Sequence, residues 1–120
     1  MIFKEATAEG IKQLEANLSA PVLPGLSFPG EDRSHLLRQD EGWVAPNHDL
    51  IDAYFKHFQK AFPEYGTDAK LARLLGLSSD RRVREYKQGR SNIPYGIWRR
   101  FLVLTGRAPQ EIIPVLAFMA

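Results

Sequence analysis

A short segment past the middle of the chain concentrates positive charge. Five Lys or Arg side chains stand among residues 81–90, and two larger apolar residues, Val83 and Tyr86, lie three positions apart between them. Arg and Lys bind phosphates and the O6 and N7 atoms of guanine in a major groove about 12 Å wide, and a glutamine such as Gln88 can bind adenine. A helix over this segment that buries only Val83 and Tyr86 would present such groups to duplex DNA.

The charge of the whole chain is small but unevenly distributed. The formal net charge is +2, yet residues 1–65 hold six Lys or Arg against ten Asp or Glu, and residues 66–107 hold ten against three. Such asymmetry indicates a partner that carries phosphates. The alternative is a solvated basic face on an ordinary domain, because composition alone reports non-specific binding and not fold.

Two short helices joined by a tight turn are predicted around the basic segment. An apolar face over residues 68–75 predicts the first helix, and Gly76 ends it because glycine adopts the left-handed conformation needed there. Ser78 or Ser79 then caps a second helix that ends at Gly89 in the same way. The turn between them is about four residues long.

This pair of helices resembles the helix-turn-helix of the phage-repressor (Cro/C1-type) superfamily, in a match that spans residues 49–106 and omits the first 46 residues. In that family a Leu-Ala pair, a turn glycine, a buried aliphatic residue, an aromatic residue three positions later and a helix-ending glycine recur in order. The aliphatic residue here stands seven positions after the turn glycine, where the family usually has six, so the base-facing residue among positions 80–82 stays open. The matching residues are Leu71, Ala72, Gly76, Val83, Tyr86 and Gly89.

The resemblance implies a sequence-specific, double-stranded DNA-binding regulator of transcription, repressor-like and of bacterial or phage type. Residues 79–88 would form the recognition helix in a bundle of about five helices, and a homodimer would bind half-sites about 34 to 36 Å apart. It implies no catalytic residue, metal or cofactor. The implied base-reading residues are Arg81, Arg82 and Glu85, and the implied phosphate ligands are Ser79, Arg84, Lys87, Arg90 and Asn92.

Helical periodicity predicts the elements that position this segment. Asn47 is expected to cap a helix over residues 49–62, and Thr67 to cap the helix that begins at residue 68. A further helix over residues 93–105 places Phe101 in the core. Its neighbouring cations Arg99 and Arg100 are either solvated or in contact with the DNA backbone, and its aromatic residues Tyr95 and Trp98 are expected in the core or a dimer interface.

The two ends of the chain are less regular. A helix is predicted over residues 7–18 with Thr7 as its cap, and the Pro- and Gly-rich segment 19–30 is predicted to be a loop or an extended arm. Residues 35–37 suggest one helical turn and residues 42–44 a short strand. The apolar residues of the segment 108–120, with Pro109 near a helix start and Pro114 inside it, are expected to be buried in the core or against another copy. The predicted organisation is therefore all-α, with a helix and arm at 1–46 and a compact DNA-binding domain at 47–120.

Several other classes of function find no support in the sequence. The chain has no cysteine and no run of 18 apolar residues, and its first residues do not resemble a signal peptide, so a cytoplasmic location is expected. Nucleophile-elbow, phosphate-loop and His-Glu-x-x-His patterns are absent, which argues against an enzyme. His48 and Asp52 have the spacing of two metal ligands, but a charged helix start explains them better. The main alternative is a non-enzymatic protein-binding module with the same helical fold, such as a phage or mobile-element factor that binds an acidic surface of a host protein. RNA binding is a weaker alternative.

Overall fold

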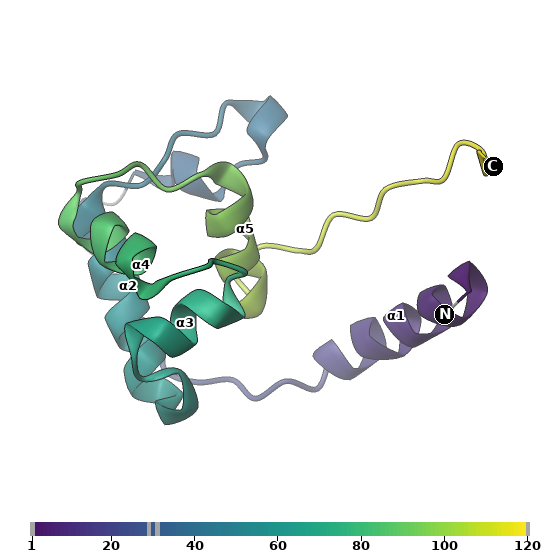
Figure 1. Cartoon of the computed structure of the whole chain (residues 1–120), viewed down its shortest axis with the longest axis horizontal. Helices are drawn as coiled ribbons and strands as arrows, with labels where there is room; N and C mark the ends of the chain where they lie inside the picture. The colour runs from purple at the N-terminus through teal and green to yellow at the C-terminus, as the bar shows by residue number, and fades with distance from the viewer. Residues whose placement is uncertain (1, 29, 31, 120) are drawn as a thin grey trace.

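The computed structural model describes residues 2–28, 30 and 32–119, and within these residues it is all-helical, without strands (Figure 1). This confirms the predicted all-α class. Pro29 of the predicted arm and Ala120 of the predicted terminal segment lie outside the described residues, as do Met1 and Glu31. The α-helices are α1 (Phe3–Asn17), α2 (His48–Ala61), α3 (Asp68–Leu74), α4 (Asp80–Gln88) and α5 (Tyr95–Leu104), with 3-10 turns at Arg33–Leu36, Gln39–Glu41 and Pro63–Tyr65.

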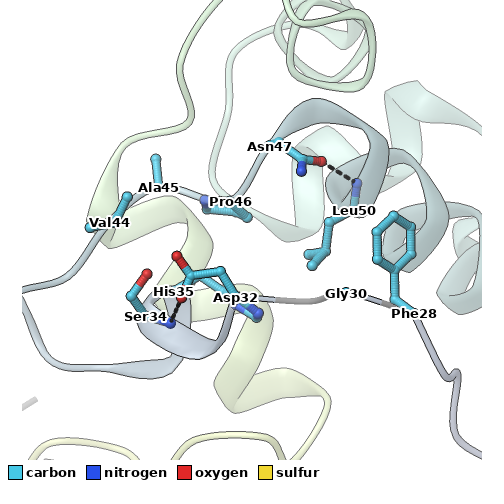
Figure 2. Close-up of a pocket in the computed structure, with 10 residues that line it drawn as sticks. All are labelled: Phe28, Gly30, Asp32, Ser34, His35, Val44, Ala45, Pro46, Asn47 and Leu50. Atoms are coloured by element: carbon cyan, nitrogen blue, oxygen red, sulfur yellow. Dashed lines mark hydrogen bonds between the residues drawn. The ribbon is translucent and has the colours of Figure 1, made fainter.

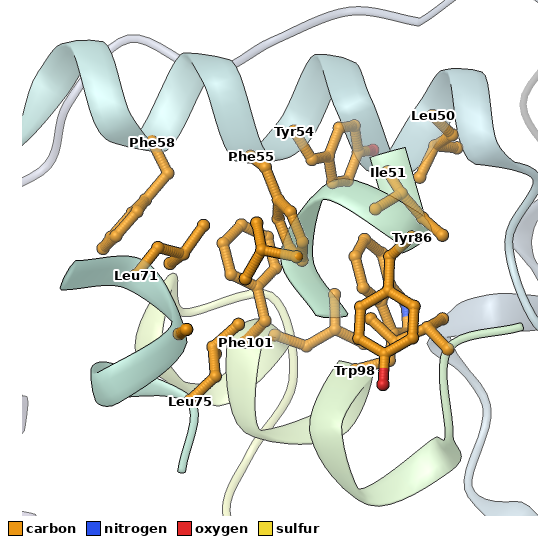
Figure 3. Packing of buried hydrophobic residues seen from close by; sticks show 14 of the residues in the cluster. Leu50, Ile51, Tyr54, Phe55, Phe58, Leu71, Leu75, Tyr86, Trp98 and Phe101 are labelled. Carbon is orange, nitrogen blue, oxygen red and sulfur yellow. The ribbon is translucent and has the colours of Figure 1, made fainter. Parts of the chain in front are cut away.

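The core lies where α2 faces α3, α4 and α5. Phe55 of α2 and the α5 residues Trp98 and Phe101 are completely buried, and their rings lie in contact, with centroids 4.9 Å apart for Phe55 and Phe101 and 5.4 Å apart for Trp98 and Phe101. Figure 3 shows the α2 side chains pointing into the space between the other three helices. Burial of these aromatic side chains and their apolar neighbours is the main force that holds the four helices together.

Side-chain caps begin two of these helices where the sequence predicted them. The Asn47 side-chain oxygen accepts a hydrogen bond from the Leu50 amide at 3.0 Å, and the Thr67 hydroxyl accepts one from the Lys70 amide at 3.3 Å. Each cap satisfies a backbone donor that the first helical turn leaves without a partner. The predicted starts of α2 and α3 are thus correct to within one residue.

Left-handed glycines end α3 and α4, also as predicted. Gly76 has a φ of 78° and Gly89 a φ of 74°. After α3 the Leu77 amide donates to the Ala72 carbonyl at 2.8 Å, and after α4 the Arg90 amide donates to the Glu85 carbonyl at 3.0 Å. Both ends have the bonding pattern of a Schellman motif, which lets the chain leave the helix sharply.

The segment before α2 packs on the bundle instead of forming a loose arm. His35 is 1% exposed, and its Nδ1 accepts a hydrogen bond from the indole N–H of Trp98 at 3.1 Å. The indole N–H of Trp43 donates to the His35 carbonyl at 3.1 Å. The predicted helical turn at residues 35–37 is present as the 3-10 turn Arg33–Leu36, but the strand predicted at 42–44 is wrong, since Gly42 is left-handed there, with a φ of 95°. The packed unit begins near Leu26, which contacts the core.

Helix α1 and the C-terminal tail (residues 109–119) lie on the same side of the bundle, outside it (Figure 1). No residue of α1 is buried, and it starts at Phe3, so Thr7 lies inside the helix and does not cap it. The tail forms no helix and its residues are exposed, so the expected burial in this core is wrong. Pro114 explains the missing helix, because proline lacks an N–H donor and disfavours helical geometry in Ile113. These extensions raise the radius of gyration to 16.0 Å, against about 14 Å for a compact domain of this length.

Within the described part of the chain, no helix is both long enough and apolar enough to span a membrane.

Candidate nucleic-acid interface

One face of α4 packs against the bundle and the opposite face is open to solvent. Val83 is completely buried and Tyr86 is 3% exposed. Arg81, Glu85 and Gln88 are spaced i, i+4 and i+7, so at 3.6 residues per turn they form a stripe on the side away from these two residues. Arg81 and Gln88 are exposed and Glu85 is half-buried. We call this set the outer stripe.

Ion pairs within α4 orient two of its arginines. The Arg81 Nε lies 3.6 Å from the Glu85 Oε1, and the Arg84 Nη1 lies 2.6 Å from the Asp80 Oδ2. The Arg81 and Arg84 side chains are 78% and 48% exposed, and ion pairs at such sites contribute at most about 1 kcal/mol. Each guanidinium has five N–H donors, so donors remain for an incoming ligand.

The structure separates Arg81 from Arg82. Helix α4 starts at Asp80, which places Arg81 in the outer stripe and turns Arg82 toward the edge that Tyr86 shares with the bundle. Burial raises the pKa of the Tyr86 hydroxyl, and the nearby positive charge of Arg82 partly opposes this rise. Arg82 is exposed on this flank, a position that suits the DNA backbone better than base edges.

Lys87 has a different role from the phosphate ligand implied by the resemblance. Its ammonium lies 2.7 Å from the Asp68 Oδ1 and 2.9 Å from the Gln59 Oε1, and only 13% of its side chain is exposed. Desolvation is the largest single effect on the pKa of Asp68, and it raises this pKa. The hydrogen bonds from Lys87 and Gln59, together with the Lys87 charge, outweigh it, so the pKa lies below its ordinary value. Lys87 therefore joins α4 to α2 and α3, and we remove it from the predicted phosphate ligands.

Three further cations of the basic segment at residues 66–107 bind groups within the protein. Arg99 is 9% exposed, and it donates to the carbonyls of Leu36 at 3.2 Å and Pro109 at 3.4 Å. Arg107 lies over the ring of Tyr54, 4.4 Å from its centroid. Arg100 donates through Nε to the Leu74 carbonyl at 3.0 Å, near the C-terminal end of α3, and remains exposed. Of the two cations considered for backbone contact, Arg99 is thus buried in the structure and Arg100 still reaches solvent.

The remaining predicted phosphate ligands surround the two ends of α4. Ser79 occupies the N-cap position, but its side chain makes no capping hydrogen bond and it is exposed. Arg90 and Asn92 follow the left-handed Gly89 and are exposed as well. Arg73, which the sequence analysis did not single out, is also exposed, in the last turn of α3 just before the turn to α4. Its place at the end of the first of the two predicted helices could have identified it as an exposed cation near α4.

A small cavity of about 190 Å³ lies between the segment before α2 and the start of α2 (Figure 2). Its polar lining consists largely of groups that already cap helical turns. The Asn47 side chain caps α2, and an Asp32 oxygen accepts a hydrogen bond from the Ser34 amide at 3.0 Å, which lowers the pKa of Asp32. At the start of α2, the His48 Nδ1 lies 3.4 Å from an oxygen of Asp49 and not beside Asp52. The described residues include no group of three potential metal ligands.

Comparisons with protein-family models, curated proteins and solved structures found no match to this chain.

Proposed function

We propose that the chain binds double-stranded DNA with α4 lying in the major groove, and that it regulates transcription. The observation that carries the proposal is the orientation of α4. Its apolar residues Val83 and Tyr86 are buried, while Arg81 and Gln88 are exposed on the opposite side. A tight turn joins the start of α4 to α3. An α-helix fits the major groove, and Arg and Gln are the side chains that most directly distinguish guanine and adenine there.

The outer stripe would read bases and its flanks would hold the backbone. Arg81 would donate to O6 and N7 of guanine, Gln88 would pair with adenine, and Glu85 would accept from the N4 amine of cytosine once its ion pair with Arg81 opens. The proposed phosphate ligands are the exposed polar groups on either side: Ser79, Arg82, Arg84, Arg90, Asn92 and Arg73.

The wider role we propose is that of a small cytoplasmic regulator that acts as a pair of copies on a two-part DNA site. Occupancy of such a site would repress or activate a promoter according to its position. We propose no catalytic activity, because the sequence lacks the nucleophile, phosphate-loop and metal-protease patterns named above.

Fluorescence anisotropy with a library of random and genomic duplex fragments tests the proposal. We expect binding that weakens as salt increases, with some fragments bound about 10³-fold or more tightly than the rest. The Arg81→Ala/Gln88→Ala variant should lose this preference, whereas Lys12→Ala on α1, whose side chain is 74% exposed, should retain it. If no duplex binds even at low salt, the proposal fails and a protein-binding module for an acidic partner becomes the better hypothesis.

A further inference from the structure

Helix α1 and the tail together form an apolar layer outside the bundle. Phe3 of α1 contacts Phe118 of the tail edge to face, with ring centroids 5.1 Å apart. Ile11 and Leu14 of α1 line a shallow groove together with Ile112 of the tail. Most apolar side chains of this layer are nevertheless more than half exposed: Ile2, Phe3, Ile11, Leu18, Ile112, Ile113, Val115, Leu116, Phe118 and Met119.

The number of exposed apolar side chains in this layer is more than a soluble monomer usually carries in one patch. Soluble monomers rarely expose an apolar patch larger than about 300 to 600 Å². A standard interface buries about 800 Å² on each partner, contributed by about 20 to 30 residues. Ten described apolar side chains of the layer, on α1, at its two ends and in the tail, are more than half exposed, so the layer exposes more apolar surface than such a monomer and can form one half of an interface.

We propose that a second copy of the chain covers this layer, with the two α1 helices antiparallel about a two-fold axis near Gly10. The apolar face of α1 contains positions 3, 7, 10, 11, 14 and 18, and this spacing reads the same from either end. Antiparallel pairing therefore sets Phe3 against the partner's Leu18, and Thr7 against the partner's Leu14. At the centre a Cβ added to Gly10 would meet no atom within 4 Å, so a second helix can approach closely there.

Charge on α1 favours the antiparallel arrangement over the parallel one. Lys4 and Glu15 lie 11 positions apart on the same edge of the apolar face, at opposite ends of the helix. Antiparallel pairing brings Lys4 near the partner's Glu15, and the two-fold axis forms this contact twice. The pair Glu9 and Lys12, 3.4 Å apart, lies on the outer side of α1 and keeps that side polar.

The inference deepens the proposed function, because it supplies the second copy that a two-part DNA site requires. It does not depend on DNA, since the contacts lie on α1 and the tail. The tests below contain no DNA, so the interface and the DNA-binding proposal can fail separately.

Disulfide formation tests the geometry directly, because the natural chain has no cysteine. In an antiparallel pair, Gly10→Cys lies beside its own counterpart at the axis, while two Leu18→Cys residues are about 22 Å apart along the helices. A disulfide requires the two Cα atoms within about 7 Å. Oxidation of the full-length chain should therefore link most of the Gly10→Cys protein and little of the Leu18→Cys protein. Equal linking of both variants, or linking of neither, would overturn the proposal.

Sedimentation equilibrium tests the partner and the charge contact. The unmodified chain should sediment as a dimer, and Ile11→Glu/Leu14→Glu should raise the dissociation constant at least 100-fold. Ala16→Glu, on the outer side of the same helix, is the matched control and should remain dimeric. Lys4→Glu and Glu15→Lys should each weaken the dimer several-fold, and the double exchange should restore it. A monomeric natural chain, an unaffected Ile11→Glu/Leu14→Glu variant, or no restoration by the double exchange would each contradict the antiparallel dimer.

Discussion

The ammonium of Lys87 lies 2.7 Å from the Oδ1 atom of Asp68, and this contact fixes α4 relative to the first turn of α3. Gln59 of α2 completes the cluster, donating to the same Asp68 oxygen at 3.1 Å while accepting from Lys87. The three residues come from three helices, so this small polar network helps to set the orientation of α4 relative to α2 and α3. The outer stripe is therefore held by polar contacts as well as by the apolar core.

Removing the Lys87 ammonium should destabilise the fold. Lys87→Met retains most of the side-chain volume but leaves Asp68 partly buried without its cation, and we expect a loss of about 1 to 3 kcal/mol in the free energy of unfolding. Lys56→Met is the matched control, because Lys56 pairs with Asp52 at 2.9 Å with 68% of its side chain exposed, and it should lose less than about 1 kcal/mol. Urea denaturation measures both. Equal losses in the two variants would show that the network does not stabilise the fold.

The same network makes stability depend on acid. Because the pKa of Asp68 is lowered in the folded state, its contribution is fully present above the unfolded pKa of about 3.9 and is lost as the pH falls through the folded pKa. The free energy of unfolding should therefore decrease below about pH 4, and Lys87→Met should flatten this decrease. Denaturation at a series of pH values from about 6 to about 2.5 provides the measurement. A variant as acid-sensitive as the natural chain would rule out this network as the source.

Gly89 should tolerate a methyl group much less well than Gly76. Both are left-handed, which costs a residue with a Cβ about 1 to 2 kcal/mol. A Cβ at Gly89 would also lie 2.7 Å from the His48 Cδ2, whereas one at Gly76 meets nothing within 4 Å. Thermal unfolding of Gly89→Ala should show the larger loss, and His48→Ala should recover part of it. No recovery would mean that the contact with His48 is not the cause.

Substitutions on α4 should separate base reading from backbone binding. Arg81→Ala should cost about 1 to 3 kcal/mol on the preferred duplex and relax one base position, while Arg84→Ala should weaken all duplexes alike. Anisotropy titrations against the preferred duplex and single-base variants of it distinguish the two. If Arg84→Ala alters sequence preference as Arg81→Ala does, the assignment of stripe and flank is wrong.

The affinity for DNA should depend on salt less steeply than the ten Lys and Arg residues at positions 66–107 suggest. Lys87, Arg99 and Arg107 bind groups within the protein, so they release no counterions on DNA. If each chain contacts about 4 phosphates, the slope of log K against log salt is about −3.6 per chain. Titrations at four or more salt concentrations give this value. A slope near zero would remove the phosphate assignments altogether.

Local signals in the sequence predicted helices α2, α3 and α4 well, because each signal depends on a few neighbouring residues. Asn47 and Thr67 cap helices with their own side chains, and Gly76 ends one through its own backbone. The role of His35 could not be predicted in this way, since its partner Trp98 lies 63 positions away. The role of Lys87 was missed for the same reason, because only the packing of α2 against α3 and α4 brings Gln59 and Asp68 to it. The candidate site was thus predicted in outline, as a helix with exposed arginines, but the sequence did not show which of its cations bind groups within the protein.

The connections between the dimer layer and the bundle determine how far apart the two bundles of a dimer can lie on DNA. Residues 18–25 are exposed and contain two prolines and a glycine, and nine steps of extended chain separate Asn17 from Leu26. Such a connector reaches at most about 30 Å. The tail has a much shorter link, because it follows directly after the buried Ala108 and its Glu111 accepts a hydrogen bond from Tyr95 of α5 at 2.8 Å. In a dimer held by this layer, the tails rather than the connectors would therefore set the distance between the two bundles, and an operator for this chain would need a defined spacing between its halves.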